Sequence, residues 1–202
     1  MTSRREFLQI GATASALSFA GRAAWGAGLS LHDSSASSVA LYKVLYDTRI
    51  PASVAFARRA ESRGVPTYAM TGDMTRFWYD DLYHRWLAEP AAIAGLTAHG
   101  PMFCLERLAW DQGMRVVFRA EHTPSENGLI HHAFTGPADV LHEAQKLAAG
   151  SSWCEGLADI AMRLPNGRNE IDSATAVAAA HLELPPHADA LYSWVIAPAK
   201  RA

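Results

Sequence analysis

The chain has 202 residues, half of them hydrophobic, and its 18 Lys and Arg against 20 Asp and Glu give a net charge of −2 at pH 7. This length suits one ordinary domain with a real hydrophobic core and would be cramped for two. Because no run of Lys or Arg forms a basic stripe, nucleic acid is not an expected partner.

The first 26 residues have the organisation of an export signal. Residues 3–9 read Ser-Arg-Arg-Glu-Phe-Leu-Gln, and an apolar stretch over residues 10–20 follows, far shorter than the ~20 residues of a spanning helix. Arg22 and the small residues Ala24 and Gly26 complete the pattern. The segment resembles a twin-arginine signal peptide. The alternative is a fortuitous pair of arginines at the start of a cytoplasmic helix.

This resemblance implies a domain layout and a set of partners. We expect a signal peptide over residues 1–26, a flexible segment over 27–38 and a single domain over 39–202. The twin-arginine export machinery and signal peptidase would be partners, and no membrane span would remain after cleavage. Since this route carries folded proteins, it implies a periplasmic protein and suggests an exported redox enzyme as a further partner. The identity of any cofactor stays unknown.

The mature chain alternates short β-like runs with longer helical runs. Strands are expected over residues 39–46, 66–70, 91–96 and 114–119, and the helices between them end near residues 63, 89 and 113. This order predicts a three-layer α/β fold, with a mostly parallel sheet and helices on both faces, Rossmann-like or flavodoxin-like. In the second helix, Trp78, Leu82 and Trp86 form a core-facing stripe, beyond which Phe77, Tyr79 and Tyr83 could face a ligand or partner.

The C-terminal part is less regular. Residues 124–137 are expected to form a long surface excursion, and helices are expected over 139–149 and 152–164. Residues 174–184 fit either helix or strand, and 191–197 predict a final strand, expected at the sheet edge. The two cysteines, Cys104 and Cys154, fall in predicted helices and could form a disulfide or remain as free thiols.

Polar residues gather where the predicted strands end. In an open parallel sheet, ligands bind beyond the carboxyl ends of the strands, where helix N-termini present free N–H groups. We therefore predict a small-ligand site at this edge, with two candidate acid–base groups, His99 and His122. The predicted ligand-binding residues are Asp47, Thr48, Arg49, Thr71, Asp73, Thr97 and Gly100.

The chemistry of these residues suggests an anionic ligand. Arg49 offers a planar donor for a carboxylate or phosphate, and the Gly100 amide would add a donor at a helix start. Each residue also has a structural alternative: the Asp and Thr residues as helix caps, Arg49 as a solvated side chain, His99 as a turn residue. Two functions follow, a binding or accessory protein and a small enzyme that acts on an anionic substrate.

Several common signatures are missing from the sequence. No Gly-x-Gly-x-x-Gly, Gly-Lys-Ser/Thr or Gly-x-Ser-x-Gly motif occurs, so neither a nucleotide nor a serine nucleophile is indicated. No Cys-x-x-Cys motif supports a zinc ribbon, a thioredoxin-type site or a c-type haem. The spacing of His122, His131 and His132 matches no metal-ligand motif, and no metal is predicted.

Overall fold

The structure is a computed structural model that describes residues 38–164, 170–180, 182–185 and 187–199. The predicted signal peptide and nearly all of the predicted segment 27–38 lie outside these residues. The described residues belong to one compact unit. None of its helices combines the length and the apolar character needed to span a membrane.

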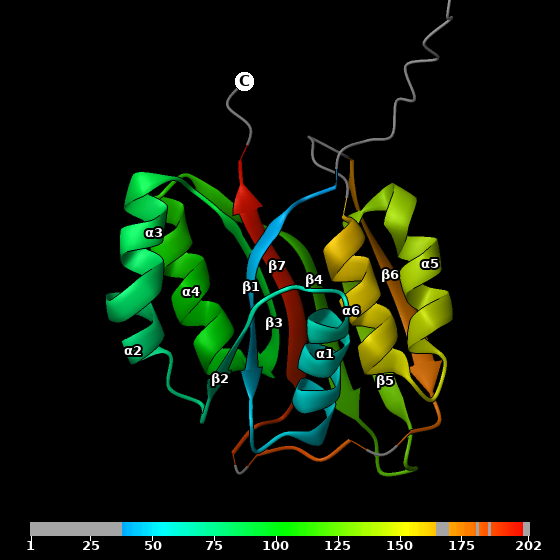
Figure 1. The fold of residues 1–202 in the computed structure, drawn as a ribbon. Coiled ribbons are helices and arrows are strands. Elements are labelled where there is room, and N and C mark those ends of the chain that lie inside the picture. Colours follow the sequence, from blue (N-terminus) through cyan, green and yellow to red (C-terminus); the bar gives the residue numbers. More distant parts are fainter. Residues whose placement is uncertain (1–37, 165–169, 181, 186, 200–202) are drawn as a thin grey trace, which may run out of the picture. The chain divides into compact units, whose positions relative to one another are not determined.

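A seven-stranded sheet lies at the centre of the described residues (Figure 1), in the order β2-β1-β3-β7-β4-β5-β6. The strands are β1 (Leu41–Asp47), β2 (Thr67–Met70), β3 (Ala92–Ala98), β4 (Met114–Pro124), β5 (Ile130–Pro137), β6 (Ile171–Ala178) and β7 (Leu191–Pro198). The helices are α1 (Pro51–Ser62), α2 (Thr75–Phe77), the π-helical turn η1 (Trp78–Leu82), α3 (Tyr83–Ala88), α4 (His99–Asp111), α5 (Ala138–Ala148) and α6 (Trp153–Arg163).

The strand directions divide the sheet into two parts. β1 pairs in parallel with β2 and β3, whereas β7 runs antiparallel between β3 and β4, and β4, β5 and β6 form an antiparallel meander. Five of the seven strands, β1, β2, β3, β4 and β6, consequently run in the same direction. The predicted mostly parallel α/β sheet is confirmed, and the antiparallel position of β7 is a feature that the sequence did not predict.

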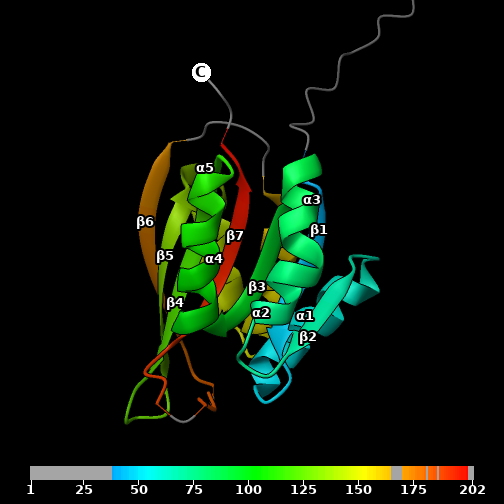
Figure 2. The same cartoon turned by 90° about the vertical axis from the view of Figure 1, so that its left-hand side faces the viewer.

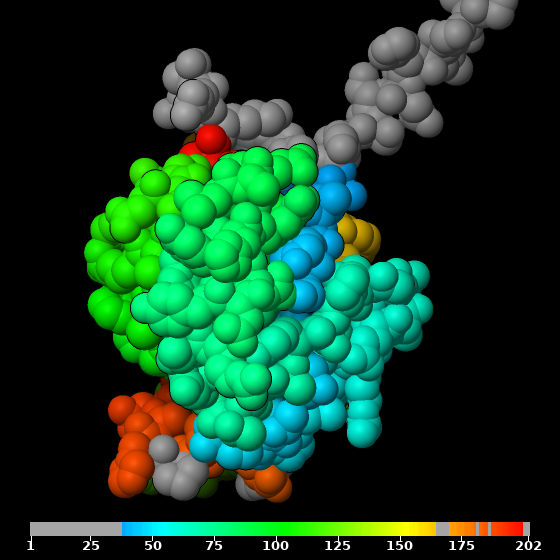
Figure 3. Space-filling view, turned by 60° about the vertical axis from the view of Figure 1, so that its left-hand side comes forward, coloured from blue at the N-terminus to red at the C-terminus, as the bar shows by residue number. Residues whose placement is uncertain are grey.

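Helices cover both faces of the sheet, which confirms the three-layer fold. On one face α1, α5 and α6 bury side chains such as Phe56 and Leu157. On the other face the continuous segment α2–η1–α3 and helix α4 bury Leu82 and Met102. Figure 2 shows the second helix layer in front of the sheet, and Figure 3 shows its outer surface.

The predicted aromatic stripe is largely correct, with one change. Trp78 and Trp86 are buried as expected, but Phe77 is buried as well. The wider turn of η1 shifts the helix phase by one residue, so two consecutive aromatic side chains face the core. Tyr79 and Tyr83 remain exposed.

Two expectations for the second half of the chain are wrong, and one left open is decided. The segment predicted as a surface excursion contains β5, because β4 runs on to Pro124 and a tight turn closed from the Ser125 amide to the Leu129 carbonyl (2.8 Å) leads into the next strand. From Ile130 to Gly136, β5 alternates between buried and exposed residues, the period of a strand with one open face. Of the two alternatives left open for residues 174–184, the strand is present, because β6 covers 174–178 of them. The final strand is central rather than at the edge.

Both cysteines lie in helices, as predicted, and both are free thiols. Cys104 is exposed on α4, whereas Cys154 is buried on α6. Burial, followed by a hydrogen bond to Glu155, raises the pKa of the Cys154 thiol to about 12. Cys154 therefore stays protonated at neutral pH and behaves as a small core residue.

Candidate functional site

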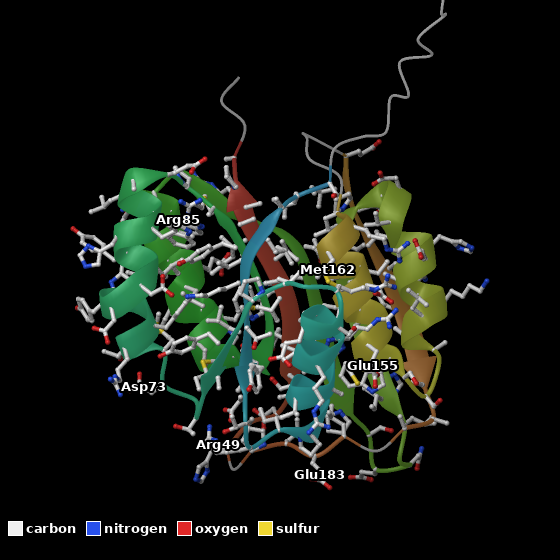
Figure 4. All side chains as sticks on the ribbon, in the orientation of Figure 1. Arg49, Asp73, Arg85, Glu155, Met162 and Glu183 are labelled. Atoms are coloured by element: carbon white, nitrogen blue, oxygen red, sulfur yellow. The ribbon has the colours of Figure 1, made fainter. Side chains whose placement is uncertain are left out.

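The predicted site residues lie at or just beneath the edge of the sheet where β1, β2 and β3 end. Arg49 and Asp73 mark this edge in Figure 4. The structure divides the predicted residues among four places and leaves Thr97 in the core, rather than gathering them into one site.

Asp47 and Arg49 form the first place, a clamp at the end of β1. The Asp47 carboxylate is 1% exposed and accepts three hydrogen bonds from Arg49: from the amide (3.0 Å), from Nε (3.0 Å) and from Nη2 (2.7 Å). These bonds and the Asp47 charge raise the pKa of Arg49. The guanidinium lies against Gly72, where an added Cβ would sit 2.3 Å from Nη2. Arg49 is thus already paired, although its side chain stays half-exposed.

Thr48, Thr71 and Asp73 form the second place. They line a shallow hollow of about 320 Å³, together with Tyr68 and Arg76. The Asp73 carboxylate accepts a hydrogen bond from the Thr75 amide (2.8 Å), and this interaction with Thr75 lowers the pKa of Asp73. Asp73 therefore forms a local turn just before α2, but it is not the N-cap of that helix, which is Met74.

His99 and Gly100 form the third place, a larger hollow of about 500 Å³. α4 begins here, and no side chain caps its first N–H groups. The His99 ring stacks on Phe103 with centroids 5.7 Å apart and meets Tyr192 edge-on at 5.4 Å. The residues that line this hollow are Ala98, His99, Gly100, His187, Ala188, Asp189, Ala190 and Tyr192.

Two features distinguish this third hollow. His187 has φ of +66°, a left-handed conformation that is uncommon outside glycine and is frequent at binding sites. Burial raises the pKa of Tyr192, and the nearby Glu121 carboxylate raises it further, so the phenol is a hydrogen-bond donor at neutral pH. The hollow therefore combines two imidazoles, a phenol, a carboxylate and the start of a helix.

Thr97 does not line either hollow. β3 continues to Ala98, beyond the predicted end of the strand, and this turns Thr97 into the core. Its hydroxyl accepts a hydrogen bond from the Trp194 indole (3.1 Å) and donates one to the Ala98 carbonyl (2.9 Å). Thr97 serves to satisfy a buried indole N–H.

His122 is the fourth place and lies inside the protein. Because β4 runs through this position, the ring faces α6 and is completely buried. Its Nδ1 lies 2.7 Å from Nδ1 of His132, its Nε2 lies 3.0 Å from the Ser193 hydroxyl, and its ring centroid is 4.6 Å from that of Trp153. His132 Nε2 is buried without a hydrogen-bond partner.

Burial decides the protonation of this pair. It lowers the pKa of His122 well below the ordinary value, with the neighbouring His132 as the second cause. Burial, with His131 as the second cause, lowers the pKa of His132 to about 4. Both rings are neutral at pH 7, so one Nδ1 donates a proton and the other accepts it. The His122 ring is not exposed to solvent.

Sequence reasoning missed His187, Asp189 and Tyr192. They were missed because the final strand was expected at the sheet edge, whereas β7 starts beside the end of β3. The pairing of His122 with His132 was also missed. The signal in the sequence was the spacing of ten residues between the two histidines, because a hairpin with a tight turn between them places them opposite each other on adjacent strands.

Comparisons with protein-family models, with curated proteins and with solved structures found no match. Among the described residues, no group of three or more His, Cys, Asp or Glu side chains is arranged to hold a metal ion.

Proposed function

We propose that this protein is an exported binding or accessory protein that holds a small anionic ligand in the hollow at the start of α4. The observation that supports this proposal most is the hollow itself. Three segments of the chain meet there and bring together His99, His187, Tyr192 and a helix start without a side-chain cap. Amide N–H groups and the positive end of the helix dipole favour an anion at this position.

The lining also narrows the ligand chemistry. The Gly100 amide and the imidazoles supply donors, whereas Pro101 has no N–H and the Tyr192 hydroxyl already interacts with Glu121. Asp189 adds one carboxylate to the same lining. A ligand that carries an anionic group beside a hydroxyl or amine would use both sets, so a small hydroxy acid or amino acid fits better than a bare anion.

Arg49, which the sequence predicted as a donor for the anionic ligand, contributes less to ligand binding than expected. Its guanidinium is held by a buried carboxylate, so the pair carries little net charge toward a ligand. We retain the Asp47–Arg49 clamp as a rigid support for the β1 and β2 loops, with Thr48, Thr71 and Asp73 in the adjoining hollow as secondary candidates.

The accessory part of the proposal depends on export. The resemblance of residues 1–26 to a twin-arginine signal carries this step, and the proposed partner is a redox enzyme exported by the same route. Replacing Arg4 and Arg5 together by Lys should retain the precursor in the cytoplasm, measured by fractionation. Normal appearance of the variant in the periplasm would contradict the export proposal.

The alternative function is a small enzyme in which His99 moves a proton for an anionic substrate. His99 favours it because the ring is exposed at the hollow and lies beside Tyr192. His122 would need an opening of the core to reach a substrate, so this alternative rests on His99. Turnover of a bound hydroxy acid or amino acid would separate the enzyme from the binding protein.

Thermal unfolding of the full chain tests the site. We expect phosphate, lactate or glycine at saturating concentration to raise the melting temperature, because a ligand that binds only the folded state stabilises it. His99→Gln should remove most of this shift, whereas His142→Gln, at an exposed position on α5, should keep it. An equal shift in both variants, or no shift with any probe, would reject the site.

A further inference from the structure

The outward face of α4 carries an unusual set of exposed side chains. Phe103, Arg107, Trp110 and Asp111 follow one another at the helical spacing that places residues on one side. Phe103 is 42% and Trp110 44% exposed, on the side of the helix opposite the buried Met102 face. Large exposed aromatic side chains at a helix surface are typical of interaction sites.

Arg107 lies between the two aromatic rings. Its guanidinium carbon is 4.0 Å from the Trp110 ring centroid and 5.1 Å from that of Phe103. Among the described residues, no carboxylate pairs with it. The rings hold the flat guanidinium in place, while its N–H groups remain available for a carboxylate.

Asp111 is the matching unpaired anion. It is the last residue of α4 and is exposed. A carboxylate at a helix C-terminus is disfavoured by the helix dipole, and no salt bridge within the described residues compensates it. Arg107 lies four residues before it, but a cation placed N-terminal to an anion is the weaker order for an i, i+4 pair.

We propose that this face of α4 binds a second copy of the chain. If two α4 helices cross antiparallel about a two-fold axis near Trp110, Arg107 of each copy meets Asp111 of the other. The contact is self-complementary, as a two-fold interface requires. It pairs both unpaired charges and covers the two Trp110 rings. The neighbouring segment α2–η1–α3 shares this outer surface in Figure 3.

Charge reversal gives a test that a nonspecific apolar contact would not pass. Sedimentation equilibrium of the full chain, at concentrations on the order of 1–100 µM, should show a monomer–dimer equilibrium. Arg107→Asp and Asp111→Arg should each weaken the dimer at least about tenfold, because like charges then face each other. The double variant should restore dimerisation, because the two charges have exchanged places.

Two further variants control for packing and folding. Trp110→Ala should weaken the dimer at least about tenfold, as is usual for a central Trp. Leu87→Ala, at a residue of α3 that is 57% exposed, should leave the equilibrium unchanged. At a concentration where every variant is monomeric, circular dichroism should show the same melting curve for the variants and the wild-type chain. A monomeric wild-type chain at all concentrations, or a double variant as weak as the single ones, would overturn the proposal.

Discussion

The two parts of the sheet differ in how they are covered. The parallel strands β1 and β3 lie between two helix layers, and six of the seven residues of β3 are buried. β5 and β6 are covered by α5 and α6 on one face only, and the other face presents exposed residues such as Ala133 and Thr175. The difference shows that strands buried on both faces leave polar residues only at their ends, whereas half-open strands place them along their length.

The parallel and antiparallel parts of the sheet meet where Gly95 in β3 pairs with Trp194 in β7. A substitution at this junction is the strongest test of the difference between the two parts. An added Cβ at Gly95 would lie 2.6 Å from the indole and 2.8 Å from the Leu45 carbonyl oxygen. Because backbone cannot move aside, Gly95→Val should lower the free energy of unfolding by about 3 kcal/mol or more. Urea denaturation measures this loss.

Gly100 is the matched control for Gly95. No atom lies within 4 Å of an added Cβ there, so Gly100→Ala should change the free energy of unfolding by less than about 0.5 kcal/mol. Equal effects at the two glycines would show that the tight junction between β3 and β7 is not formed as described.

The buried pair of His122 and His132, in the antiparallel part of the sheet, predicts that the stability of the fold depends on pH. His132 stays neutral down to about pH 4, its pKa in the folded state, and burial also lowers the pKa of His122 well below the ordinary value. Unfolded histidines bind protons below about pH 6.5. The unfolded state therefore binds more protons, and stability falls as pH decreases from about 6.5 to 4. Each buried histidine contributes about 1.4 kcal/mol per pH unit.

Neighbouring residues again provide the control. His132→Asn should reduce the slope of unfolding free energy against pH by about one proton, about 1.4 kcal/mol per pH unit. Thr135→Asn, at an exposed residue of the same strand that has no titrating group, should leave the slope unchanged. Urea denaturation from pH 7 to pH 4.5 measures both, and an unaltered slope in His132→Asn would count against a neutral buried pair.

The same difference in covering explains how much of the fold was predictable. The near-continuous apolar strands and the helices between them, up to residue 113, were found within a few residues of their bounds. In the second half, the Gly and Pro residues around His131 and His132 indicated a loop, while the alternation of Ile130, His132 and Phe134 indicated a strand. The alternation was the better guide, because it follows from burial on one face.

The candidate site was predictable only in part. The rule that ligands bind beyond the carboxyl ends of strands placed His99 and Gly100 at the larger hollow. It misplaced Thr97 and His122, because both strands continue past the expected ends and turn these side chains into the core. His187 and Asp189 could not be assigned to the site, since their position depends on β7 inserting between β3 and β4.

The central claim is that a small anion binds at the start of α4. An amide NMR titration of the full chain with phosphate and with lactate tests it most directly, because every N–H reports its own surroundings. We predict that the saturable shifts are centred on Gly100, His99, Asp189 and Tyr192. No saturable shift with either probe, or shifts centred on Thr71 and Asp73 instead, would contradict the account.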